Sequence, residues 1–135
     1  MDDVKRFIDS DRLAKHLGIE MLDHGAGTAR ARMAIQDYHL NSAGTLHGGA
    51  TFALADAVFA AASNSHGTLA MAINVSISYF KALKGGTVTA SAEEVSLGPK
   101  LGTYLVTVRD DGGETVALFQ GTVYRKNEGL PAAGA

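Results

Sequence analysis

Residues 47–66 read HGGATFALADAVFAAASNSH, and this stretch decides the fold. Its composition predicts one long helix that is apolar on nearly every side, with a single charged residue, Asp56, near the centre. The positions three and four residues from Asp56 share its helix face, and all of them are Phe or Ala. A helix of this kind belongs inside a core. An isolated carboxylate there costs free energy unless it is paired, neutralised or used in chemistry.

The same helix is expected to begin at a glycine pair, Gly48 and Gly49. The first N–H groups of a helix have no acceptor within the helix, and the helix dipole adds positive charge at that end. Such a terminus can hold an anion or a developing oxyanion. The stretch therefore combines a desolvated carboxylate with an oxyanion-type donor, which indicates chemistry on a carbonyl group.

The flanking sequence predicts short helices before this helix and strands on both sides of it. Residues 4–17 have a broken apolar stripe, with Asp9, Ser10 and Asp11 placed to cap a second short helix. Residues 36–46 form a polar connection. The alternation of one later strand slips at Glu93-Glu94, which predicts a β-bulge. The expected strands cover residues 19–26, 28–35, 71–79, 87–97, 101–109 and 114–125.

Only residues 47–66 are apolar enough to fill a core. The economical arrangement is an α+β fold in which a curved antiparallel sheet wraps around one long central helix. We predict one domain over residues 1–126, including an N-terminal helical segment over 1–17, and a flexible tail over 127–135. Because sheet edges are usually paired or covered, a dimer is expected.

The composition argues against several classes of function. The 135 residues include no cysteine, which excludes disulfides, thiolate nucleophiles and cysteine-ligated metals. A net charge of -2 gives no support for nucleic acid or an anionic membrane as a partner. The N-terminal residues lack the apolar core of a signal peptide, and residues 47–66 make a poor membrane span. We therefore expect a cytoplasmic protein.

Residues 41–49, NSAGTLHGG, followed by a helical Asp in the segment LADA, resemble the hot-dog-fold acyl-CoA thioesterases. The resemblance is closest to the phenylacetyl-CoA (PaaI-like) branch. The family element N-x-x-G-x-x-H-G-G is matched position by position. Two weaker matches are ISYFK at residues 77–81 and VALFQG at residues 116–121. The likeness extends from about residue 17 to residue 124, and it implies the hot-dog fold.

The resemblance implies an enzyme that hydrolyses the thioester of an acyl-CoA, with an aryl-acetyl or medium-chain acyl group, to a carboxylic acid and free coenzyme A. It also implies a homodimer with shared active sites, often paired again into a homotetramer. In that arrangement one subunit supplies Asn41 and Gly48, and the other supplies Asp56. No cofactor is expected, because coenzyme A is part of the substrate.

The matched motif assigns roles to four candidate catalytic residues. Asp56 would act either as general base for the attacking water or as a nucleophile that forms a transient anhydride. The N–H of Gly48 would polarise the thioester carbonyl. Asn41 is either a routine turn residue or a group that orients the water or the thioester. His47 is either a base or, as we favour, an anchor for its loop. The histidines lack metal-ligand spacing, so no metal is expected.

Candidate substrate-binding residues lie around the same motif. Gly49 would allow close approach of another backbone. Aromatic side chains could line an acyl pocket, although core packing is the alternative for each of them. The phosphates of coenzyme A call for cations at the site mouth, although solvated surface lysines are the alternative. The candidates for these roles are Phe52, Phe80, Lys81, Lys84 and Lys100.

Two other functions remain open at this point. A hot-dog hydratase or dehydratase acting on an enoyl-CoA would pair a carboxylate with a catalytic histidine, and His47 is available for that role. A non-catalytic module that binds acyl-CoA without turnover is the other alternative. A thiol-release assay over several acyl-CoA substrates would discriminate among the three.

Overall fold

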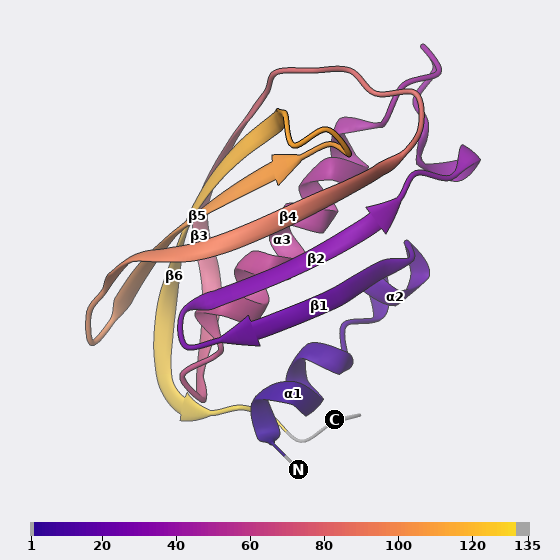
Figure 1. Ribbon diagram of the computed structural model, residues 1–135. Helices are drawn as coiled ribbons and strands as arrows, with labels where there is room; N and C mark the ends of the chain where they lie inside the picture. Colours follow the sequence, from indigo (N-terminus) through magenta and orange to yellow (C-terminus); the bar gives the residue numbers. More distant parts are fainter. Residues whose placement is uncertain (1, 132–135) are drawn as a thin grey trace.

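The computed structural model describes residues 2–131. Its strands form one six-stranded antiparallel sheet in the order β1-β2-β4-β5-β6-β3, which curves around the central helix α3 (Figure 1). The elements are α1 (Asp3–Asp9), α2 (Arg12–His16), β1 (Ile19–Gly25), β2 (Thr28–Ala34), the 3-10 turn η1 (Asp37–His39), α3 (Gly48–Ser63), β3 (Thr68–Tyr79), β4 (Thr87–Leu97), β5 (Leu101–Arg109) and β6 (Thr115–Gly129). The predicted α+β architecture, in which a curved antiparallel sheet wraps around one long central helix, is confirmed.

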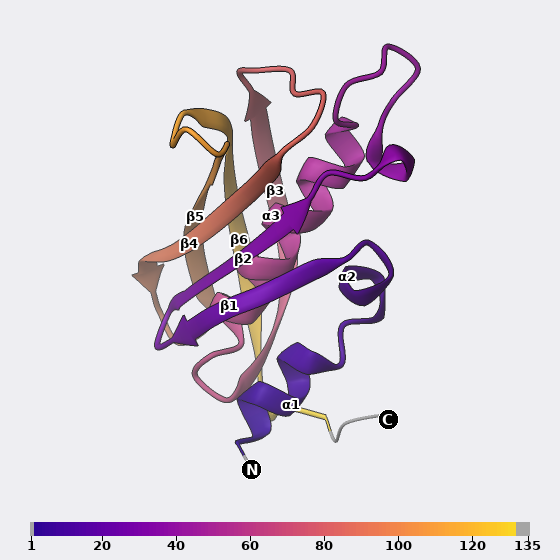
Figure 2. The same cartoon turned by 45° about the vertical axis from the view of Figure 1, so that its right-hand side comes forward.

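The core lies between α3 and the concave face of the sheet (Figure 2). Alternation in β2 buries Ala29, Ala31 and Met33 against the helix, as the sequence pattern predicts. Small residues allow the sheet to approach the helix closely. At Gly121 an added Cβ would lie 2.6 Å from the ring of Phe59, so only glycine fits there without a shift of the ring.

Local signals in the sequence placed two features correctly. Asp11 caps α2, because its carboxylate accepts a hydrogen bond of 3.0 Å from the N–H of Ala14. The pairing of β4 with β5 shifts register between Glu94 and Ser96, which confirms the predicted bulge. The sequence signal for each feature lies within a few residues of it.

The predicted boundaries were wrong at the ends of the longest elements. The helix ends at Ser63 rather than His66, because Asn64 caps it. Strand β3 begins at Thr68 and pairs with β6, which continues to Gly129. The segment predicted as a flexible tail from residue 127 therefore begins inside a strand. Residues 132–135 of that predicted tail lie outside the described residues.

Strand β3 forms one edge of the sheet and exposes apolar side chains that alternation alone would assign to a core. Met71 is 53% exposed and Ile73 is 60% exposed. The register of β3 against β6 shifts between Ala72 and Asn74, and this irregularity interrupts the alternation at Ile73. In the described part of the chain, the outer side of β3 has no strand beside it. This edge is therefore an apolar surface with unpaired backbone groups.

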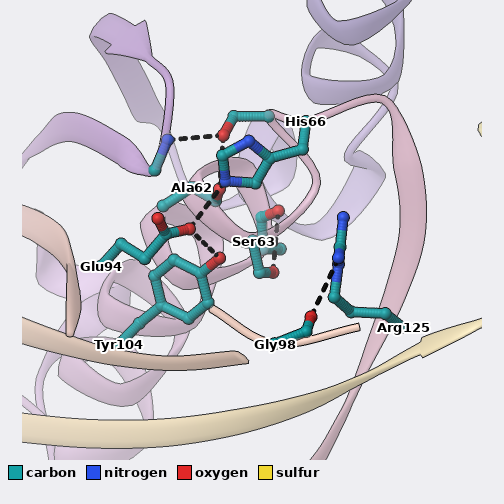
Figure 3. A network of polar contacts seen from close by, with 10 residues as sticks. Ala62, Ser63, His66, Glu94, Gly98, Tyr104 and Arg125 are labelled. Carbon is teal, nitrogen blue, oxygen red and sulfur yellow. Dashed lines mark hydrogen bonds and ion pairs between the residues drawn. The ribbon is translucent and has the colours of Figure 1, made fainter. Parts of the chain in front are cut away.

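A polar network joins β4 and β5 to the turn that follows the C-terminal end of α3 (Figure 3). The buried Tyr104 hydroxyl donates a hydrogen bond of 2.6 Å to Glu94 Oε1. The same oxygen lies 2.7 Å from Nε2 of His66, in the turn that follows α3. Burial raises the pKa of Glu94, but the hydrogen bonds from Tyr104 and His66 outweigh it and hold the pKa below the ordinary value.

Candidate active site

The first turn of α3 leaves one backbone donor available. His47 caps the helix: its Nδ1 accepts a hydrogen bond of 2.7 Å from the N–H of Gly49. Its carbonyl oxygen accepts from the N–H groups of Ala50 and Thr51, at 2.9 and 3.1 Å. Within residues 2–131, the N–H of Gly48 has no acceptor. Among the N–H groups of this first turn, that of Gly48 is therefore the one free for a ligand.

Tyr79 of strand β3 contacts the peptide group that follows Gly48. Its hydroxyl donates a hydrogen bond of 2.9 Å to the carbonyl oxygen of Gly48. A Cβ added to Gly48 would lie 3.2 Å from the tip of the Tyr79 ring, which is tight but movable because the side chain is half-exposed. The contact joins residues 31 positions apart, so no local pattern in the sequence could have revealed it.

Asp56 lies about two turns further along α3, on the side turned away from the sheet, and is half-buried. Among the described residues, its carboxylate has no hydrogen-bond or ion-pair partner. Burial raises the pKa of Asp56, and the nearby negative charge of Asp11 raises it further. A carboxylate in this state can accept a proton more readily than an exposed one.

Gly48 and Asp56 cannot meet at one reacting carbon within a single chain. They are eight residues apart in the sequence, which corresponds to about 12 Å along a helix. One subunit alone therefore does not bring the two groups together.

Asn41 belongs to the loop that projects past the N-terminal end of α3 (Figure 2). Its Oδ1 accepts hydrogen bonds from the N–H groups of Ala43 and Thr45, at 3.0 and 3.1 Å. This is the usual turn arrangement of asparagine, and it uses the side-chain oxygen within the loop. The Nδ2 group has no acceptor among the described residues, so it is the part of Asn41 that could contact a ligand.

Comparisons with known proteins now decide the family. Residues 43–117 match the model of the Thioesterase superfamily. A protein of Archaeoglobus fulgidus is 47% identical over 123 residues, which cover 90% of this chain and 80% of that protein. The acyl-coenzyme A thioesterase PaaI of Escherichia coli is 36% identical over 118 residues, covering 87% of this chain and 84% of that enzyme.

The solved structure of the E. coli PaaI protein from the phenylacetic acid degradation operon gives the same result. It superposes with a TM-score of 0.91 at 32% identity, and the match covers 96% of this chain and 94% of that one. The chain belongs to the thioesterase superfamily. The predicted resemblance to hot-dog thioesterases is confirmed, and with it the prediction of an enzyme that hydrolyses thioesters.

The three candidate lysines of this thioesterase do not gather in one place. Lys81 is engaged by the β5–β6 turn, where its Nζ lies 2.6 Å from Asp110 and 3.3 Å from Glu114. Lys84 is exposed on the loop beside the N-terminal end of α3, and it forms no ion pair within residues 2–131. Lys100 lies beyond the other end of β4, a strand of 11 residues and roughly 35 Å. Within one chain, only the first two lie at the Gly48 end.

The two candidate aromatic residues also differ. Phe52 is partly buried and packs edge-to-face on Phe119, with ring centroids 5.4 Å apart, so core packing explains it. Phe80 is exposed directly after β3, next to Tyr79.

The histidines weighed as metal ligands do not converge. His66 is paired with Glu94, and His47 caps α3. Residues 2–131 contain no group of three or more His, Cys, Asp or Glu side chains that could hold a metal ion. In the same part of the chain, no helix has both the length and the apolar character needed to cross a membrane.

Proposed function

We propose that this thioesterase hydrolyses acyl-CoA thioesters whose acyl group is medium-chain or aryl-acetyl. One observation carries the proposal: within residues 2–131, the N–H of Gly48 and the half-buried carboxylate of Asp56, both on α3, have no partner. These are the two groups that thioester hydrolysis requires. The similarity to E. coli proteins named for acyl-coenzyme A thioesterase activity and for phenylacetic acid degradation supports this substrate class.

In the proposed reaction, the carboxylate of Asp56 takes a proton from water while the water oxygen attacks the thioester carbonyl carbon. The N–H of Gly48 donates to the carbonyl oxygen, where negative charge develops. Collapse of the tetrahedral intermediate breaks the C–S bond, and the departing sulfur takes the proton. Direct attack by Asp56, followed by hydrolysis of an anhydride, is the alternative, and water labelled with 18O distinguishes the two in a single turnover.

The site requires a second copy of the chain, and we propose a homodimer with two shared active sites. The roughly 12 Å between Gly48 and Asp56 is removed when two α3 helices lie antiparallel, so that Asp56 of one subunit faces Gly48 of the other. The open, apolar edge of β3 supports such a pairing. Light scattering tests the assembly, and it also tests the further pairing of dimers into a homotetramer.

The remaining roles follow from position. Lys84, with no ion pair among the described residues at the Gly48 end, would bind the phosphates of coenzyme A. The Nδ2 group of Asn41 would orient the water or the thioester. Phe80, next to Tyr79, and Gly49, next to Gly48, would contact the substrate. The enzyme would need no cofactor, and its location in the cytoplasm stays a prediction that cell fractionation can test.

The test is release of free thiol from a panel of acetyl-, butyryl-, hexanoyl-, octanoyl- and phenylacetyl-CoA. We expect turnover with the longer or aromatic members. Loss of conjugation in an enoyl-CoA without thiol release would instead identify a hydratase. Saturable binding of acyl-CoA with neither reaction would identify a binding module, and either result would overturn the proposal.

A further inference from the structure

A cavity of about 470 Å³ lies between α3 and the two N-terminal helices. Its α3 wall consists of Ala57, Ala60 and Ala61, and α1 contributes Phe7 and Ile8 on the opposite side. Ala14 of α2 and Ile19 and Met21 of β1 also line the cavity. The helices α1 and α2 that line it lie beside α3 (Figure 2). The volume lies in the range of small-molecule sites.

The interior of this cavity is apolar, and its charged residues stay at the rim. The alanine wall leaves the space open, because a methyl group fills little of the gap between the helices. The charged lining residues are exposed or half-exposed and carry both signs. Such a cavity favours an uncharged apolar group over a charged one. The charged lining residues are Asp9, Asp11, Arg12 and Lys15.

The cavity lies beside the α3 segment that carries Asp56, although Asp56 itself is not one of its lining residues. Ala57 is the neighbour of Asp56 in the chain, and Ala60 lies one turn further on the same helix face. Asp11 lines the cavity and is also close enough to Asp56 to act on its charge. A group bound against Asp56 can therefore extend directly into the space under α1 and α2.

We propose that this cavity holds the acyl group of the substrate, with the thioester carbonyl beside Asp56 and the chain directed between α3 and the N-terminal helices. The inference rests on the proposed function and deepens it, because it makes α1 and α2 the elements that select the acyl group. The preferred acyl group is then apolar to its end, and acyl groups that end in a carboxylate are poor substrates.

Two substitutions that fill the cavity from opposite sides test the proposal. Ala14→Leu on α2 and Ala61→Leu on α3 should each lower kcat/KM for octanoyl-CoA at least tenfold, while butyryl-CoA is hydrolysed within about twofold of the wild-type rate. The matched control is Leu13→Ala, an exposed position on α2 outside the cavity lining. It should leave the ratio of the two substrates unchanged. Equal losses with both substrates, or no loss, would overturn the proposal.

Direct binding separates this proposal from the proposed function. In protein labelled at its alanine methyl groups, octanoate should shift the signals of Ala14, Ala57, Ala60 and Ala61 and no distant alanine. Such shifts with no thiol release from any acyl-CoA would contradict the hydrolase but retain the cavity as an acyl site. Normal hydrolysis with shifts elsewhere would contradict the cavity alone. This measurement uses the wild-type protein, so it tests whether the cavity binds the acyl group even if the leucine variants fail to fold.

Discussion

The polar groups at the two ends of α3 differ in whether they have hydrogen-bond partners. At the C-terminal end, the buried Asn64 uses its whole amide: it donates to the carbonyl oxygens of Ala60 and Ala70 and accepts from the N–H of Ala70. Beside it, Glu94 binds both Tyr104 and His66. At the N-terminal end, the N–H of Gly48 has no acceptor within residues 2–131.

This difference separates a stabilising region from a reactive one. Paired buried groups rigidify a structure, whereas a fixed donor without a partner is available to a substrate. One buried polar atom near the C-terminal end is an exception to this pairing: Nε of Arg125 has no hydrogen-bond partner in the described residues. Nη1 of the same side chain donates to the carbonyl oxygen of Gly98 (Figure 3). Substitutions at the two ends should therefore affect different measurements.

The largest effect is expected at Asp56, which lies between the two ends. Asp56→Asn should lower kcat about a thousandfold, because loss of a general base typically costs 10² to 10⁴ in rate. The same change should stabilise the fold at pH 7. Burial raises the pKa of Asp56, so the folded state favours the protonated carboxyl group. As pH rises through that raised pKa, the carboxyl group ionises and the folded protein loses stability. Asparagine does not ionise and avoids this loss.

Thiol release and urea unfolding check the two halves of this prediction. The stability advantage of Asp56→Asn should be present at pH 7 and disappear below pH 3.8, the ordinary pKa of the group. As pH is lowered, wild-type kcat should fall when Asp56 becomes protonated. Because the pKa of Asp56 is raised, the midpoint of this fall should lie above pH 3.8. Near-normal turnover in the folded variant would remove Asp56 from the mechanism.

The next largest effect is expected from removing the free donor at Gly48. Proline is tolerated at the first position of a helix, and His47, with ψ of 133°, already has the conformation that precedes proline. Gly48→Pro deletes the N–H, whereas Gly48→Ala keeps it and introduces the same contact of 3.2 Å with Tyr79. Relative to the alanine variant, the proline variant should lose a factor of about 10² to 10³ in kcat.

Steady-state kinetics on the two Gly48 variants decide the role of this residue. Equal activity of the alanine and proline variants would show that Gly48 is required for space and not for its N–H. Circular dichroism should show that α3 persists in both.

At the other end of α3, the expected effect is on stability and not on turnover. Tyr104→Phe should lower the free energy of unfolding by about 1–3 kcal/mol, because it removes a buried hydrogen bond to a carboxylate. The pKa of Glu94 is held low, so its contribution is present above the ordinary value of 4.5 and is lost as pH falls through the lowered value. Glu94→Gln should therefore reduce the loss of stability on acidification.

Urea unfolding at several pH values measures these changes, and thiol release at pH 7 is the control. A large fall in kcat for Tyr104→Phe, with the fold intact, would show that the C-terminal end is not merely structural.

The smallest effect is expected at the surface lysines. Lys84→Ala should raise KM for acyl-CoA about two- to fivefold, since an exposed ion pair contributes roughly 0.2–1 kcal/mol. Lys100→Ala is the matched control, because Lys100 lies beyond the opposite end of β4. Added salt should reduce the difference between wild type and Lys84→Ala. A larger effect at Lys100 would reverse the proposed orientation of coenzyme A.

What the sequence determined by itself was local. The alanine-rich run around Asp56 specified α3, the alternation in residues 28–34 specified β2, and Asp11 specified the start of α2. Such signals arise because the side-chain periods of helices and strands are fixed by backbone geometry. The motif around Gly48 and Asp56 also identified the family before the fold was known.

Only the tertiary structure decided which distant groups meet. The register of β3 brought Tyr79 onto Gly48, extended β6 to Gly129 and left Ile73 exposed at the sheet edge. The packing of α1 and α2 beside α3 opened the cavity beside the α3 segment that carries Asp56. These contacts depend on register and on the separation between packed elements. Neither quantity is encoded in the periodicity of any single segment, because each is set by the fit between segments far apart in the chain.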